Sequence, residues 1–172
     1  MIKTTVQEAI NQQIVREMFS SNLYLSMSAY FHSINLPGFA NWMHVQAQEE
    51  TTHAIKFFDY LLARGGIVTL GVIDAPELSW ESPLAAFEAA YEHEQKVTSW
   101  INEIADLAFA EKDHPTNVLI QWFINEQVEE ESNASDIVAR MRLAGHDRSS
   151  MFFLDNELKQ RKFVPPATGA TT

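Results

Sequence analysis

Apolar residues recur along this chain at alternating steps of three and four residues, the period of an amphipathic helix. The pattern predicts four long helices, bounded by residues that usually start or stop helices. We expect these helices at about 5–33, 37–64, 82–112 and 115–144. A fifth and shorter pattern, at about 149–161, predicts a C-terminal helix with apolar residues such as Phe152 and Phe153.

The connections between these patterns predict the topology. The links at 33–37 and 112–115 are short, so each joins antiparallel neighbours in a hairpin. The link at about 65–81 could extend to roughly 55 Å, whereas a 28-residue helix is only about 42 Å long. It can therefore run the length of a bundle and leave the second and third helices parallel. The expected fold is all-α, a four-helix bundle with one long crossover and a short fifth C-terminal helix.

The length of 172 residues is sufficient for one domain with a substantial core. We expect residues 1–164 to form the bundle with its fifth helix. Residues 165–172 contain two prolines and a glycine and are expected to form a flexible tail.

The composition narrows the range of partners. The chain has 23 acidic and 12 basic residues, a net charge of −11, which disfavours nucleic acid and anionic membranes and favours cations. Cysteine is absent, so disulfides, thiolate zinc sites and thiol catalysis are excluded. Carboxylate, imidazole, amide and backbone ligands remain, a set that suits iron, manganese, calcium, magnesium or zinc. The chain shows neither a signal core nor a membrane span, so we expect a cytoplasmic protein.

The two predicted hairpins carry polar residues at the same spacing. In each, a lone glutamate is followed 33 residues later by the first member of a pair of possible ligands. The residues are Glu17 with Glu50 and His53 in the first hairpin, and Glu94 with Gln127 and Glu130 in the second. The midpoint of each set falls at the hairpin turn, so folding brings the lone glutamate level with its pair. The resulting inventory is that of a two-metal site inside a helix bundle.

These candidate ligands lie in the apolar seams of their helices. Seven-residue steps place Glu17 in line with Ile10 and Tyr24, and Glu94 in line with Phe87 and Ile101. Each unpaired buried charge costs several kcal/mol, and no Arg or Lys occupies these seam positions. The carboxylates therefore stay protonated or are neutralised by cations. A polar seam that only fixes helix register is the less favoured alternative.

The number of donors fits two ions bridged by Glu50. The expected ligands are Glu17, Glu50 and His53 for one ion, and Glu94, Glu130 and Glu50 for the other. Gln127 is a neutral donor, which leaves one coordination position weak or open, as oxygen binding requires. Tyr24 could donate to a ligand or supply an electron, or could be an ordinary buried tyrosine. Trp122 is interpreted as a core residue rather than a redox group.

A second acidic cluster adjoins these residues and shares Glu130 with them. We interpret Glu131 as solvated, and favour an accessory metal site formed by Glu49, Glu126 and Glu129 over a fully solvated face. The remaining histidines are interpreted as surface or turn residues: His32, His44, His93, His114 and His146.

Taken together, four stretches resemble the ferritin family, and its bacterial non-haem branch most closely. They are Glu17 with Tyr24, then 47–53, 93–95 and 126–131, within a resemblance that covers about residues 5–160. The resemblance implies a ferroxidase centre of Glu17, Glu50, His53, Glu94, Gln127 and Glu130, with Tyr24 and Trp122 beside it. It also implies a third iron site at Glu49, Glu126, Glu129 and Glu130, and a 24-subunit cage that stores ferric mineral.

The chain departs from other branches of this family. Bacterioferritins would have a glutamate and a histidine at Gln127 and Glu130, so no haem is expected. Animal ferritins place carboxylates near residues 117–120, where this chain reads Asn-Val-Leu-Ile, so that route for iron into a cage is not expected. Rubrerythrins need a cysteine-ligated iron domain, which this chain cannot form.

The predicted function is iron storage with ferroxidase activity, in which Fe(II) is oxidised by O2 and hydrogen peroxide or water is the reduced product. The alternative is a non-storage di-iron or di-manganese oxidase or peroxidase. A third hypothesis, a non-enzymatic bundle, predicts no stoichiometric metal.

Overall fold

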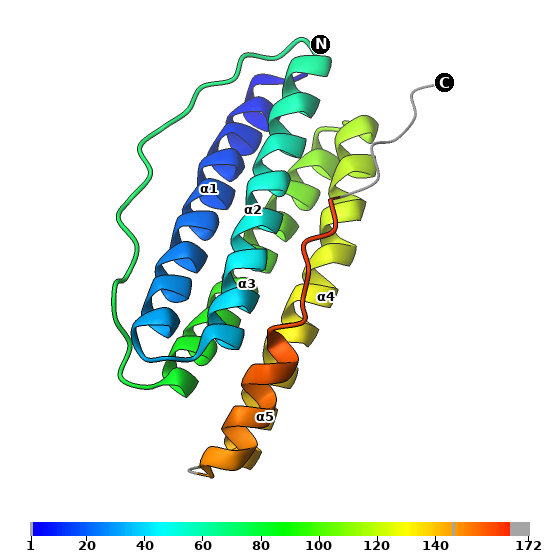
Figure 1. The fold of residues 1–172 in the computed structure, drawn as a ribbon. Coiled ribbons are helices and arrows are strands. Elements are labelled where there is room, and N and C mark those ends of the chain that lie inside the picture. Colours follow the sequence, from blue (N-terminus) through cyan, green and yellow to red (C-terminus); the bar gives the residue numbers. More distant parts are fainter. Residues whose placement is uncertain (1, 146, 166–172) are drawn as a thin grey trace.

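A computed structural model describes residues 2–145 and 147–165, and these residues form five helices and no strand (Figure 1). The helices are α1 Thr4–Ser33, α2 Pro37–Ala63, α3 Pro83–Ala110, α4 His114–Ala144 and α5 Arg148–Leu158. The all-α bundle with one crossover and a short fifth helix is therefore confirmed. The predicted tail lies outside the described residues from 166 onward, so the division of the chain at 164 stays a prediction.

The helix ends follow from local chemistry. Ser82 caps α3 by accepting a hydrogen bond from the backbone N–H of Ala85 (3.1 Å), and Asp113 caps α4 by accepting one from Thr116 (3.3 Å). The two hairpin turns each contain a residue with positive φ, Asn35 at 61° and Lys112 at 55°. Each hairpin thus closes through a single residue in the left-handed region.

The crossover between α2 and α3 runs along the outside of α1 for its whole length (Figure 1). The side-chain amide of Asn11 donates a hydrogen bond to the carbonyl of Ile67 (2.9 Å) and accepts one from the backbone N–H of Thr69 (2.8 Å), both in the crossover. The hydroxyl of Ser26 donates to the carbonyl of Glu77 (2.5 Å) near its other end. The crossover therefore makes α2 and α3 parallel, as predicted, and is fastened to the first hairpin.

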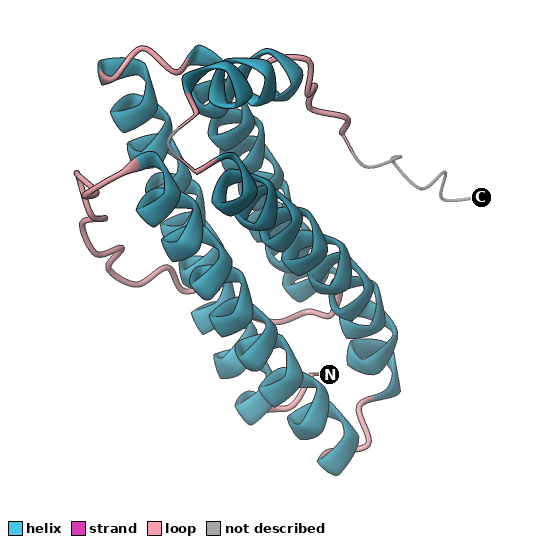
Figure 2. Cartoon of the chain, turned by 90° about the horizontal axis from the view of Figure 1, so that it is seen from below, coloured by secondary structure: helices cyan, strands magenta, loops and turns pink. Residues whose placement is uncertain are grey.

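The apolar core is divided into two clusters by a polar layer in the middle of the bundle. One cluster contains Phe31, Phe39 and Phe87, and the other contains Phe57 and Phe123, whose rings stack with centroids 3.9 Å apart. Seen from below, the long helices run side by side in a common direction (Figure 2). The predicted seams are buried, so the candidate ligands lie between two apolar layers.

The fifth helix is shorter than the sequence predicts, because it ends at Leu158 rather than near Arg161. The side-chain amide of Asn41 donates to the carbonyls of Leu158 (3.2 Å), Lys159 (3.4 Å) and Arg161 (3.0 Å). These bonds satisfy carbonyls that a further helical turn would otherwise use. Within the described residues, no helix combines the length and apolarity needed to span a lipid bilayer.

Candidate metal centre

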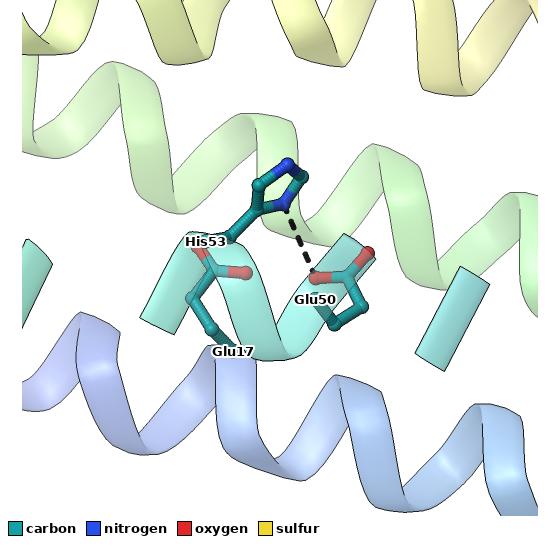
Figure 3. Close-up of side chains that lie close together, drawn as sticks. All are labelled: Glu17, Glu50 and His53. Atoms are coloured by element: carbon teal, nitrogen blue, oxygen red, sulfur yellow. Dashed lines mark ion pairs between the residues drawn. The ribbon is translucent and has the colours of Figure 1, made fainter. Parts of the chain in front are cut away.

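Three side chains from the first hairpin converge at the middle of the bundle (Figure 3). Glu17 comes from α1, and Glu50 and His53 come from successive turns of α2. One ligand atom from each lies within 4.8 Å of the others, and the three residues are 1%, 2% and 4% exposed. Among the described residues, no other group of acidic or histidine side chains brings ligand atoms this close.

The carboxylates of this group have lone pairs that no protein donor fills. Glu17 Oε1 accepts a hydrogen bond from Gln13 Nε2 (2.8 Å), whereas Glu17 Oε2 and Glu50 Oε2 are buried without a hydrogen-bond partner. His53 Nδ1 lies 3.6 Å from Glu50 Oε2, which is too far for a good hydrogen bond. Buried acceptors without donors are rare in native proteins, and a bound cation would satisfy these.

Burial also sets the protonation of this group. Desolvation raises the pKa of Glu17 well above its usual range, and the neighbouring Glu50 charge raises it further. The pKa of Glu50 is likewise raised, by burial first and then by the charges of Glu94 and Glu130. Without a metal, burial therefore favours the protonated form of these carboxyls, and an entering cation would displace such protons.

The second hairpin contributes the other candidate ligands, and these differ from the first group in their hydrogen bonding. Glu94 accepts hydrogen bonds from the hydroxyl of Tyr24 and from Gln127 Nε2 (3.1 Å). Glu130 Oε2 accepts one from Gln46 Nε2 (2.7 Å). Burial, followed by the charge of Glu94, raises the pKa of Glu130 to about 8. These residues face the same polar layer, but both oxygens of Glu94 and one oxygen of Glu130 are already paired with protein donors.

Two aromatic residues, Tyr24 and Trp122, lie beside the group. Tyr24 is fully buried and donates to Glu94, which is the arrangement of the donor alternative; an electron-supplying role stays a prediction. Trp122 lies edge-on to the ring of His53, with centroids 5.5 Å apart, and Lys56 Nζ sits 3.9 Å from the centroid of the indole. Trp122 is partly buried and packs at the edge of the core.

The outer acidic residues lie around a cavity of about 440 Å³ beside the centre. Its lining includes Glu49, Glu126, Glu129 and Glu130, so the structure brings the four predicted residues to one place. Glu49 Oε2 is paired with Arg161 Nη2 at 2.5 Å. The accessory metal site stays a prediction.

The interpretation of His93 as a surface or turn residue is wrong. Its side chain is buried, its Nε2 lies 2.8 Å from the hydroxyl of Ser20, and desolvation lowers its pKa to about 4. The steps Ala86, Ala90, His93 and Val97 form an apolar seam, which is the signal that could have placed it inside. His32, His44 and His114 are exposed as predicted, and His146 lies outside the described residues.

Three further residues that touch the centre were not predicted from the sequence. Gln13 and Gln46 direct their amide groups at Glu17 and Glu130, and Arg161 reaches Gln46 from beyond α5. A glutamine in a seam is visible in the sequence, but its partner on another helix is not.

Comparisons with known proteins agree with this architecture. A family model described as a ferritin-like domain matches residues 7–144. A bacterial non-heme ferritin of Bacteroides fragilis strain 638R is 46% identical over 161 residues, covering 94% of this chain and 100% of the relative. A bacterial non-heme ferritin of Escherichia coli O6:H1 is 36% identical over 158 residues, covering 92% and 96%.

Solved structures give the same result. The chain is similar to an engineered closed form of the Archaeoglobus fulgidus ferritin, with a TM-score of 0.94 and 51% identity over 95% of this chain and all of that one. It is also similar to an open pore ferritin from the same archaeon, with a TM-score of 0.93 and 51% identity, over 94% of this chain and 98% of that one.

Proposed function

This chain belongs to the ferritin family, and on that premise we propose that it stores iron by oxidising Fe(II) with O2 at a di-iron centre within each subunit. The ferric product is then deposited as mineral inside a 24-subunit cage, in the cytoplasm. The ligands of the centre are Glu17, Glu50, His53, Glu94, Gln127 and Glu130, with Fe(II) and O2 as substrates and no haem.

One observation carries this proposal. Glu17, Glu50 and His53 converge in the core with two carboxylate oxygens that no donor satisfies. Carboxylate oxygen and imidazole nitrogen are ligands that suit iron, and their negative charge favours the ferric over the ferrous ion. A group that served only to fix helix register would have its acceptors paired within the protein.

The second hairpin supplies what a two-electron step requires. Each Fe(II) gives up one electron, so two ions bridged by Glu50 together reduce one O2 to hydrogen peroxide, with two protons taken up; four electrons would give water. Gln127 adds a neutral ligand and leaves room for O2 at the ion held by Glu94 and Glu130. The protons that leave Glu17 and Glu50 on metal binding are released next to the reacting ions.

The proposal of a cage is supported by apolar surface that the single chain leaves exposed. Large apolar side chains are exposed on the crossover and on α5, among them Ile67, Val72, Leu78, Phe152 and Phe153. Exposed apolar side chains gathered on two regions favour burial against other copies of the chain.

Aerobic loading with excess Fe(II) tests the proposal. Metal-free protein should retain many tens of irons per chain in soluble form and elute as a particle many times larger than a monomer. Saturation at two or three irons per chain would remove storage and favour the non-storage oxidase. Absence of stoichiometric metal would favour the non-enzymatic bundle.

A further inference from the structure

The segment that follows α5 is fastened to α2. Asn41 bonds the carbonyls at the end of α5, and the carboxylate of Asp155 accepts the backbone N–H groups of Gly38 (2.8 Å) and Phe39 (3.1 Å) at the start of α2. From there the chain runs back along the bundle (Figure 1). This path delivers Arg161 to the side of α2 that faces the outer acidic residues.

Arg161 makes four contacts with three residues of α2. Its guanidinium carbon lies 4.4 Å from the centroid of the Trp42 ring, and Nη1 donates to the Trp42 carbonyl (3.3 Å). Nη1 also donates to Gln46 Oε1 (2.8 Å), and Nη2 donates to Glu49 Oε2 (2.5 Å). The side chain is only 20% exposed, so this is a partly desolvated cation with a charge-assisted hydrogen bond to a carboxylate.

Gln46 connects this cation to the candidate centre. A guanidinium can only donate, so Gln46 must present its oxygen to Arg161 and its amide N–H groups to the carboxylates. Its Nε2 lies 2.7 Å from Glu130 Oε2 and 3.5 Å from Glu50 Oε1. Arg161 is thus a single side chain away from two expected ligands of iron.

The same cavity holds the predicted accessory ligands and the guanidinium. Glu49, Glu126, Glu129 and Glu130 line it together with Arg161 and Lys56. Lys56 lies over the ring of Trp122, whereas Arg161 pairs directly with Glu49. A metal ion that bound Glu49 through Oε2, or through both carboxylate oxygens, would therefore need the oxygen that the guanidinium occupies.

We propose that Arg161 is a built-in competitor for metal ions at the outer acidic cluster, so that an ion binds there by displacing the guanidinium from Glu49. This inference rests on the proposed function, because it assumes that iron reaches the cluster from the neighbouring centre. Displacement also frees Gln46 from Arg161, so occupancy of the outer cluster alters the amide that contacts Glu130. The segment after α5 thereby sets how easily an ion leaves the centre for the cluster.

Anaerobic calorimetric titration of the metal-free assembled protein with Co²⁺ tests this inference. We call the Co²⁺ ions bound at the candidate centre the inner equivalents and the ion bound at the outer acidic cluster the outer equivalent. Arg161→Gln removes the competing charge, so the dissociation constant of the outer equivalent should fall roughly tenfold, and those of the inner equivalents should stay within about twofold. The matched control is Arg140→Gln, which removes an arginine paired with Glu157 outside the cavity and should change neither. An unchanged or weakened outer equivalent in Arg161→Gln overturns the inference.

Failure of the proposed function and failure of the Arg161 inference give different results. If the unaltered protein binds no stoichiometric Co²⁺, the proposed function fails; if it binds the inner ions and Arg161→Gln does not differ from it, only this inference fails. Hydrogen–deuterium exchange on the unaltered protein keeps the test independent of folding of the variant. The peptide covering residues 159–165 should exchange faster once the outer equivalent binds, and unchanged exchange overturns the displacement.

Discussion

The two hairpins carry their polar residues at the same spacing, but their carboxylates are in different states. In the α1–α2 hairpin, one oxygen of Glu17 and one of Glu50 accept no hydrogen bond. In the α3–α4 hairpin, Glu94 is paired with Tyr24 and Gln127, and Glu130 with Gln46. An ion that enters the first hairpin would therefore have to displace protons but no hydrogen-bond donor from these two oxygens, whereas an ion at the second hairpin would also have to displace donors that pair with Glu94 and Glu130.

This difference shows that the spacing of the candidate ligands and the availability of their oxygens for metal have separate origins. The spacing of 33 residues sets the depth at which each residue lies in the bundle. The neighbours set whether an oxygen is free, and here those neighbours come from other helices: Tyr24 from α1 and Gln46 from α2 both serve the second hairpin. We expect the first hairpin to bind metal more tightly than the second.

The largest effect is expected from Glu50→Ala, because we propose that this residue bridges the two ions. Its loss removes the bridge, and Fe(II) oxidation followed by stopped-flow absorbance should slow by roughly 100-fold or more. The control is Glu157→Ala, an exposed carboxylate paired with Arg140. Oxidation by Glu50→Ala at the unaltered rate would show that Glu50 does not bridge.

The next largest effect is expected on metal affinity and compares the two hairpins directly. His53→Ala should weaken the first Co²⁺ equivalent by about 10- to 100-fold in an anaerobic titration, because it removes a ligand of the half-site that is ready to bind. Gln127→Ala should leave the first equivalent within a few-fold of the unaltered protein. Equal losses in the two variants would mean that the hairpins do not differ in affinity.

The pH dependence of stability gives a third test. Burial raises the pKa values of Glu17 and Glu94 in the folded chain above their ordinary value of 4.5, and that of Glu130 to about 8. Between pH 4.5 and about 8 these carboxyls hold more protons in the folded metal-free chain than in the unfolded chain, so their contribution to stability should fall as pH rises, and it outnumbers the opposite contribution of the single residue His93 below about pH 6.5. Each unit of raised pKa corresponds to about 1.4 kcal/mol.

Calorimetric melting of metal-free protein between pH 5 and 9 measures this slope. Glu17→Gln should flatten it more than Glu94→Gln, because the hydrogen bonds from Tyr24 and Gln127 already hold down the pKa of Glu94. A metal-free chain that gains stability with pH would contradict the assignment of protonated carboxyls.

The smallest effect is expected from Tyr24→Phe. It removes a donor that Glu94 must lose before it can bind an ion, so the second Co²⁺ equivalent should tighten by roughly 3- to 10-fold. The first equivalent should not change, because Tyr24 makes no hydrogen bond to Glu17 or Glu50 among the described contacts. A weakened second equivalent would mean that the hydroxyl orients Glu94 for metal rather than competing with it.

Much of the fold could be predicted from the sequence, because the helical period of the apolar residues and the residues that start or stop helices are local features of the chain. The seam residues Ile10 and Tyr24 are fully buried as predicted, and the links predicted at 33–37 and about 65–81 separate helices in the structure. The candidate ligands could be placed at one depth because an antiparallel hairpin pairs residues equidistant from its turn.

The remaining features depend on contacts between elements that are distant in sequence. His93 was misplaced although the apolar seam of its own helix could have shown its burial; only its partners Ser20 and Tyr24, which lie on another helix, could not be predicted from the sequence. Gln46 and Arg161 are 115 residues apart, and Arg161 lies in a segment without helical period, so no spacing rule connects them. The unequal hydrogen bonding of the two hairpins has the same origin.

The crossover has a consequence for how the two halves of the chain stay together. It is fastened to α1 through Asn11 and Ser26, so it belongs physically to the first hairpin and only its last residues lead to α3. A single cleavage after Glu77 would yield two polypeptides, one with the crossover still attached. Association of the two fragments would then become bimolecular. A metal ion bound by Glu50 of one fragment and by Glu94 and Glu130 of the other would link the fragments in place of the cleaved peptide bond.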